Sequence, residues 1–430
     1  MPPFRPFRPL ALGAAALAVC LAAGACTLSD SDSANRITLT VDLFGSFGFK
    51  EAGLYDEYMK AHPNIVIKES GTPDEGRYWK NLRNRLDSGT GLADVQGLSA
   101  DRLAGVVRRR AGSFTDLRAV GLAAADQGLL PWKSAAATAG DGRVLAVGTD
   151  SGPEAICYRT DLLKAAGLPT RRDKLAAKWS TWDGYLALGR KYAAKAGPGH
   201  AWTDSAESLF TAEMGQQRVR YTDEHGKPVH ADNPAVKTAW KHAARLVEDR
   251  LTAKAPQNSA KWNKALSSGG FATVICPAWM LDRIEARAGD RYAGRWDVAP
   301  APGRAGNVGG SYLAIPGTSK HPEEAAALVE WLTAEQQQVR LFTRRGLFPS
   351  SQGAQAQVRL AQDPYFNNAP VGEIFTQAAA GTAVWVSGAD DTAVQREFDD
   401  ELRAMESAGI SRETGWKRAL AGADKIVGSR

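Results

Sequence analysis

Three features of the sequence predict an α/β protein with two lobes. From residue 37 to residue 98, apolar residues switch repeatedly between the two-residue period of a strand and the helical period near 3.6. A similar α/β pattern resumes after a turn signal near Gly140. The chain also has 430 residues, whereas single hydrophobic cores stop growing at about 250 to 300 residues.

The first set of elements reads strand, helix, strand, helix, strand. Residues 37–43 alternate as a strand, and residues 54–59 place their apolar side chains on one helical face. A second strand is expected at residues 65–67, a helix over residues 78–86 and a third strand at residues 94–98. This order predicts a parallel sheet with crossover helices.

The second set begins after the turn dipeptide at Asp141, with a strand at residues 144–147. A variant capping box opens a helical pattern over residues 180–192. Pro322 and two following acids are typical of a helix first turn. Beyond Pro349 the remainder is expected to be mainly helical.

The N-terminus predicts export from the cytoplasm. Arg5 and Arg8 precede an apolar run at residues 10–21, which is shorter than the roughly 20 residues of a membrane-spanning helix. Residues 1–25 are therefore expected to be a signal peptide.

Small residues lead into Cys26 and resemble a bacterial lipobox, although Ala23 stands where a leucine is usual. That resemblance implies acylation of Cys26 and anchoring to the outer face of the cell membrane, with residues 26–35 as a flexible tether. The alternative is ordinary cleavage near Ala25, without a lipid.

Cys157 and Cys276 are the only other cysteines that remain after the signal peptide leaves. Each lies in a short apolar run typical of a buried strand, and the compartment is oxidising. A disulfide between them and a pair of packed free thiols are both compatible with the sequence. The formal net charge of +6 comes from interspersed charges, which gives no indication of nucleic-acid binding.

Several segments, in order and at fitting distances, resemble the bacterial extracellular solute-binding proteins of carbohydrate ABC importers, which are related to maltodextrin-binding proteins. These segments are residues 89–95, 114–117, 141–153, 158–169, 181–183, 276–280 and 309–316. The resemblance covers nearly the whole chain. It implies a type II periplasmic-binding-protein-like fold, in which two α/β lobes close on a ligand cleft by a hinge motion.

The resemblance also implies lobes that are discontinuous in sequence. The N-terminal lobe is expected at residues 36–148 and 309–350, and the C-terminal lobe at residues 149–308 and 351–430. Crossing segments are expected near residues 148–152, 307–312 and 349–364.

A sugar offers apolar faces and a rim of hydroxyls, so its site needs aromatic platforms and fixed polar groups. Trp202, Trp279 and Trp385 are the stacking candidates, since they fall in segments that correspond to the family's cleft. A core position remains the alternative for each of them.

Asp150, Asp94, Ser46, Gly310 and Ser311 are the candidate hydrogen-bonding residues. Capping or strand-end bonding is the alternative for the two aspartates. Tight turns would also explain the glycines.

The function implied by the resemblance is capture of a di- or oligosaccharide and its delivery to ABC permease subunits with a separate ATPase. A monomer without metal or cofactor is expected, and no common catalytic motif is present. A lipoprotein that binds a peptide or polyamine is the alternative. A secreted glycoside hydrolase is more remote, because the acids at residues 399–401 form a charge pattern typical of a solvated helix face.

Overall fold

The computed structural model describes residues 36–122, 128–385 and 388–428. Within it, residues from Ile37 onward form one compact unit. The expected signal peptide, the acylated Cys26 and the tether lie outside the described residues. In the described part, no helix is both long and apolar enough to cross a membrane.

The strands are β1 (Ile37–Phe44), β2 (Ile65–Thr72), β3 (Val95–Ser99), β4 (Val147–Arg159), β5 (Thr273–Pro277), β6 (Trp296–Pro300), β7 (Asn307–Ala314) and β8 (Phe348–Pro349). The α-helices are α1 (Leu54–Ala61), α2 (Glu75–Ser88), α3 (Ala100–Arg109), α4 (Pro131–Ala137), α5 (Thr160–Ala165), α6 (Arg172–Lys178), α7 (Trp182–Ala193), α8 (Ala206–Gly215), α9 (Pro234–Glu248), α10 (Ala260–Ser268), α11 (Met280–Ala288), α12 (Pro322–Thr333), α13 (Glu335–Arg345), α14 (Gln352–Val358), α15 (Val371–Gly381), α16 (Asp391–Ala408) and α17 (Arg412–Gly428). Short 3₁₀ helices lie at Ala111–Ser113, Leu117–Val120 and Asp290–Tyr292.

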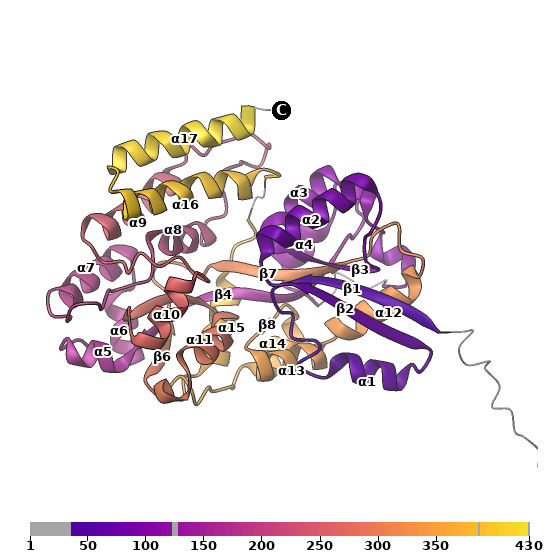
Figure 1. Ribbon diagram of the computed structural model, residues 1–430, viewed down its shortest axis with the longest axis horizontal. Coiled ribbons are helices and arrows are strands. Elements are labelled where there is room, and N and C mark those ends of the chain that lie inside the picture. The colour runs from indigo at the N-terminus through magenta and orange to yellow at the C-terminus, as the bar shows by residue number, and fades with distance from the viewer. Residues whose placement is uncertain (1–35, 123–127, 386–387, 429–430) are drawn as a thin grey trace, which may run out of the picture. The chain divides into compact units, whose positions relative to one another are not determined.

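The first three strands form the predicted parallel sheet. β1 pairs in parallel with β2 on one side and β3 on the other, and β7 then adds antiparallel to β3. Leu39, Val41 and Leu43 of β1 are buried on one face against residues that include Leu328 of α12. On the other face, Tyr78 of α2 belongs to a cluster shared with α3 and β7. The sheet is thus covered by helices on both faces, as Figure 1 shows for its indigo strands.

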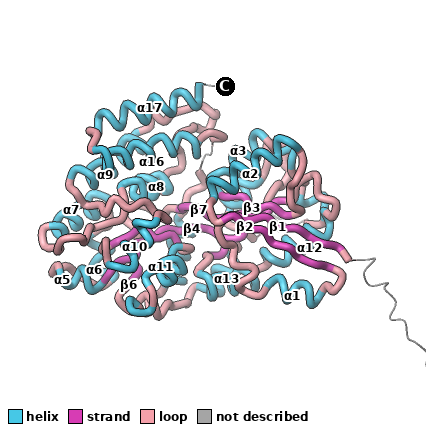
Figure 2. The backbone as a smooth tube through the Cα atoms, viewed as in Figure 1, coloured by secondary structure: helices cyan, strands magenta, loops and turns pink. Residues whose placement is uncertain are grey.

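β4 is a long strand that belongs to both halves of the structure. One half is built around β1, β2 and β3, and the other around β5 and β6. Its first part pairs with β7 and β8, and its second part pairs with β5 and β6. Every residue of β4 is buried. In Figure 1, β4 and β7 run side by side from one group of helices to the other, and Figure 2 shows the strands as a central band between helices.

The helices around β5 and β6 enclose a second set of core side chains. One cluster joins α7, α8, α9, α16 and α17, and another contains Cys157, Cys276 and residues of α10, α11 and α15. Cys157 of β4 and Cys276 of β5 form a disulfide, which decides between the two alternatives left open by the sequence.

Candidate functional site

Three chain segments meet where the halves join. Asp150 of β4 pairs with Ser311 of β7 on one side and with Pro349 of β8 on the other. The Ser350 hydroxyl also donates to the carbonyl of Gly148 at 2.7 Å. These positions fall at or beside the three crossing segments expected from the sequence.

Gly310 allows β4 and β7 to lie this close together. Its φ is +96°, and a Cβ there would lie 2.9 Å from the Asp150 carbonyl oxygen and 3.1 Å from Lys133 Nζ. Both the left-handed conformation and the lack of space require glycine. Gly310 therefore has a structural role at the crossing.

Lys133 and Asp150 are both buried beside this crossing, where the charge of each affects the pKa of the other. The Lys133 ammonium donates to the Ser311 carbonyl at 3.0 Å and lies 3.8 Å from the Tyr312 ring centroid. Burial lowers the pKa of Lys133 to about 7, against the opposing charge of Asp150. Burial likewise raises the pKa of Asp150, and the positive charge of Lys133 partly offsets that rise. Only 7% of the Asp150 surface is exposed. Its side chain therefore lies among residues of the neighbouring strands and does not face an open cleft.

A cavity of about 380 Å³ opens beside the crossing, between elements of both halves. This volume falls within the roughly 300 to 1,000 Å³ typical of small-molecule sites. Its wall combines the N-terminal ends of α2 and α3, the start of β7, the region from α8 to Tyr221, Trp385 and the first half of α16. The charged lining residues are Glu75, Asp101, Arg102, Arg220, Asp391, Arg396, Asp399 and Arg403.

On the β1–β3 side, Glu75 and Arg102 face the cavity. Glu75 accepts a 2.8 Å hydrogen bond from the Ser99 hydroxyl and lies 3.5 Å from Arg102 Nε. The Arg102 guanidinium also lies 5.3 Å from the Trp79 ring centroid. Burial raises the pKa of Glu75.

On the opposite side, α16 presents a polar stripe to the cavity. Asp391, Gln395, Asp399 and Arg403 recur every four residues and so share one helix face. Gln395 donates to Asp399 at 2.8 Å. Burial, together with the negative charge of Glu207, raises the pKa of Asp399 to about 8.

Direct contacts join the two sides next to the cavity. Arg109 of α3 makes two 2.6 Å hydrogen bonds to the carboxylate of Asp390. The Thr392 hydroxyl donates to the carbonyl of Asp101. The two sides of the cavity are therefore in direct contact at its edge, through α3 and the start of α16.

Of the three tryptophans predicted to stack on a ligand, Trp385 lines the cavity. Trp279 is half-buried beside the crossing, where its indole N–H donates to the carbonyl of Val308 at 3.0 Å. Val308 itself lines the cavity. The guanidinium of Arg283 lies 4.7 Å from the Trp279 ring centroid.

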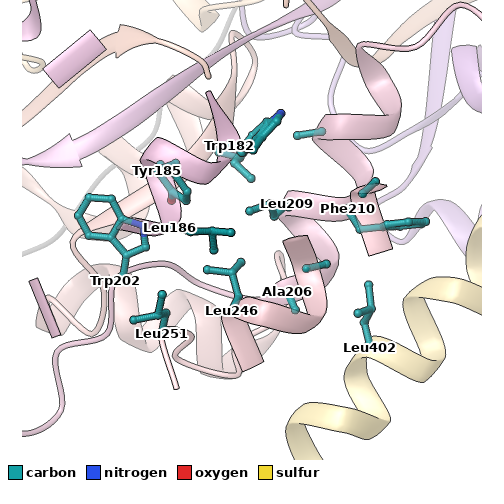
Figure 3. Close-up of a cluster of buried hydrophobic side chains, with 14 of the residues drawn as sticks. Trp182, Tyr185, Leu186, Trp202, Ala206, Leu209, Phe210, Leu246, Leu251 and Leu402 are labelled. Carbon is teal, nitrogen blue, oxygen red and sulfur yellow. The ribbon is translucent and has the colours of Figure 1, made fainter. Parts of the chain in front are cut away.

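Trp202 is a core residue, which corrects the expectation of a stacking role. It is 0% exposed and its ring packs near Trp179, Tyr185 and Tyr192, with centroid distances of 5.0 to 6.3 Å. Figure 3 shows it among buried leucines and aromatic rings. A ligand cannot reach a ring that other side chains enclose on every side.

Asp94 and Ser46 also lie away from the cavity lining. Asp94 accepts from the Thr40 amide at 2.9 Å and from the hydroxyls of Thr40 and Ser319 at 2.7 Å each. Its carboxylate thus links β1 to the start of β3 and to the loop before α12. This is the strand-end hydrogen bonding given above as the alternative to ligand binding. Ser46 is exposed in the turn after β1.

The sequence did not single out Arg220, Glu75 or the α16 stripe. Asp399 was assigned to a solvated helix face, and this is wrong, because Asp399 faces the cavity while Asp400 is exposed. The four-residue spacing of polar side chains along α16 was the available signal. Among the described residues, no group of three or more His, Cys, Asp or Glu is arranged to hold a metal ion.

Comparisons with known proteins agree with this architecture. A family profile described as bacterial extracellular solute-binding protein matches residues 53–368. A lactose-binding protein of Rhizobium radiobacter is 27% identical over 291 residues, which cover 62% of this chain and 67% of that protein.

Solved structures extend the likeness over most of the chain. An extracellular solute-binding protein of family 1 is 40% identical, with a TM-score of 0.81, and the match covers 91% of this chain and 99% of that one. The galacto-N-biose-/lacto-N-biose I-binding protein of Bifidobacterium longum, solved with lacto-N-biose, shares the fold at 16% identity, with a TM-score of 0.76 and coverage of 92% and 98%. On the strength of the family match and of this shared two-lobed fold, the chain belongs to the bacterial extracellular solute-binding proteins.

Proposed function

We propose that this protein captures a di- or oligosaccharide in the cavity beside the crossing strands and delivers it to the permease of an ABC importer. The observation that carries the proposal is the half-buried Trp385 in a cavity whose lining also includes many charged and amide side chains. An indole face suits the C–H face of a sugar, and carboxylate, guanidinium and amide groups suit its hydroxyls.

The ligands of two similar proteins support a sugar as the ligand of this one. A lactose-binding protein and a lacto-N-biose-binding protein both match most of their own length to this chain. The shared fold makes hinge closure around the ligand the expected mechanism, with Lys133 and Asp150 at the hinge. Ligand can shift the closure equilibrium only by binding the closed form more tightly.

We extend the proposal to the parts of the chain outside the cavity. Acylated Cys26 would hold the protein at the outer face of the membrane, and residues 26–35 would serve as its tether. The N-terminal lobe would comprise residues 36–148 and 309–350, and the C-terminal lobe residues 149–308 and 351–430. The protein would act as a monomeric binder without cofactor and without catalysis.

A thermal-shift screen against mono- and oligosaccharides tests this proposal. A ligand that binds the folded state alone stabilises it by about 2.7 kcal/mol at a hundredfold excess over the dissociation constant. We expect one sugar class to raise the melting temperature of the wild type, and the Trp385→Ala variant to lose that shift.

Three outcomes would count against the proposal in different ways. A shift with a peptide or polyamine and none with sugars would refute the sugar assignment. Release of reducing sugar from an oligosaccharide would show catalysis. Retention of the sugar shift by Trp385→Ala would place the binding site elsewhere.

A further inference from the structure

The indole ring of Trp385 already has neighbours in this structure. The Trp132 ring centroid lies 4.5 Å from that of Trp385, with the planes tilted by 36°. The guanidinium carbon of Arg220 lies over the Trp385 ring, 4.8 Å from its centroid. A sugar that stacks on Trp385 therefore meets Arg220 at the same ring.

Arg220 is held at this ring by few other interactions. The hydrogen bond that its side chain makes is a long one, from Nη2 to the carbonyl of Gly215 at 3.4 Å. Its Nε is buried and has no hydrogen-bond partner in the part of the chain that the structure describes. Among the described residues, no carboxylate lies within 4.0 Å of the guanidinium, unlike that of Arg403 in the same cavity.

Carboxyl groups that could receive Arg220 lie close by. Both carboxyl oxygens of Glu154 are buried beside the Gln216 side chain, and no well-formed hydrogen bond to them is present in the described part of the chain. Burial raises the pKa of Glu154 well above its usual range, and the positive charge of Arg220 partly opposes this. The same charge lowers the pKa of Asp391, although burial raises it overall. The geometry agrees, because Arg220 donates to the carbonyl of Gly215, where a Cβ would lie 2.3 Å from Glu154 Oε1. Thr222, two residues after Arg220, donates its hydroxyl to Asp391.

We propose that Arg220 occupies the stacking face of Trp385 in the ligand-free protein, and that a sugar binds by displacing the guanidinium toward the carboxyl groups of Glu154 and Asp391. This proposal rests on the proposed sugar site and adds an element that sets its affinity. Arg220 competes with the ligand, so each sugar that stacks on Trp385 binds more weakly by the free energy needed to displace the guanidinium.

Removal of the competitor should tighten binding. A cation–π contact of ordinary strength corresponds to about 2- to 30-fold in an equilibrium constant. In calorimetric titration with the sugar identified by the screen, we expect the dissociation constant of Arg220→Ala to fall by a factor in that range. Arg220→Lys keeps the charge without the planar guanidinium, so its dissociation constant should lie between those of the wild type and Arg220→Ala.

The effect should depend on Trp385. In a Trp385→Ala background, Arg220→Ala should leave the weakened affinity unchanged, because no ring remains to be uncovered. Arg83→Ala removes an exposed arginine of α2 outside the cavity lining and controls for the change in net charge. Circular dichroism spectra and urea midpoints verify that each variant is folded.

A second measurement needs no sugar. The contribution of Trp385 to acrylamide quenching is the difference between each protein and its Trp385→Phe counterpart, and it should be larger in Arg220→Ala than in the wild type. Weaker or unchanged sugar affinity in Arg220→Ala would overturn the proposal, as would unchanged quenching. If no sugar binds any variant, the sugar function fails, while the quenching result still reports whether Arg220 covers Trp385.

Discussion

Replacing Trp202 with alanine is expected to destabilise the protein strongly while leaving the sugar site in place. The ring is 0% exposed and packs near three other aromatic rings. Its indole N–H has no hydrogen-bond partner, so the substitution breaks no hydrogen bond. The cost is therefore lost packing and a cavity, about 3 to 5 kcal/mol for a buried tryptophan.

The surrounding structure leaves little scope to collapse into that cavity. A Cβ on Gly189 would lie 2.6 Å from the Trp202 ring, which shows how closely α7 approaches it. We expect urea unfolding, followed by far-ultraviolet circular dichroism, to show a large drop in the midpoint for Trp202→Ala. Trp202→Phe keeps more of the volume and should lose less.

Trp385→Ala is the matched control, because this ring is half-buried and lines the cavity. It should lose sugar affinity with a smaller change in the urea midpoint. The reasoning would be refuted if Trp202→Ala lost less than about 1 kcal/mol, a typical single-substitution effect. Loss of sugar binding in a Trp202→Ala protein of normal stability would restore Trp202 as a ligand contact.

Three further changes test other parts of the structure. Burial raises the pKa of Asp399 to about 8, so the folded state retains a proton that the unfolded state loses near pH 4. The stabilisation is complete at low pH and falls as pH rises toward 8, by up to about 1.4 kcal/mol per unit. Melting temperatures at pH 6, 7 and 8 should therefore fall less steeply in Asp399→Asn, and parallel slopes would contradict this assignment. Replacing Cys157 and Cys276 with serine opens a link between residues 119 apart and should cost about 2 to 5 kcal/mol in urea unfolding; equal midpoints would argue against the disulfide. Gly310→Ala should destabilise the crossing, because a Cβ would lie 2.9 Å from a carbonyl oxygen at a φ of +96°. Gly71→Ala, where a Cβ meets nothing within 4 Å, is its control, and equal melting temperatures for the two variants would contradict the strand packing at Gly310.

Much of the secondary structure follows from the sequence. The alternation at residues 37–43 became β1, and the helical spacing that begins at Trp182 became α7, with the Thr181 hydroxyl accepting from the Gly184 amide at its N-terminus. These features depend on neighbours a few residues apart, so a periodic pattern is sufficient to reveal them. The expectation of crossing segments came from the resemblance to a known family and not from the periodic pattern.

The candidate site was predicted only in part. Trp202 and Trp385 are both tryptophans in loop-like segments, yet one is enclosed by aromatic rings and the other lines a cavity. Asp399 and Asp400 are neighbours on one helix, yet one faces the cavity and the other faces solvent. The pattern along the chain does not distinguish the members of either pair.

The sequence by itself determined the α/β alternation, the apolar face of each strand and helix, and the two cysteines available for a disulfide. Only the tertiary structure decided that these cysteines are adjacent, that Trp385 is the tryptophan in the cavity, and that Arg220 lies over its ring. The physical reason is that local periodicity fixes which face of an element is apolar or polar, whereas burial depends on the segment that covers that face. Trp202 is covered by the rings of Trp179 and α7, and Asp399 faces a cavity whose other walls come from distant parts of the chain.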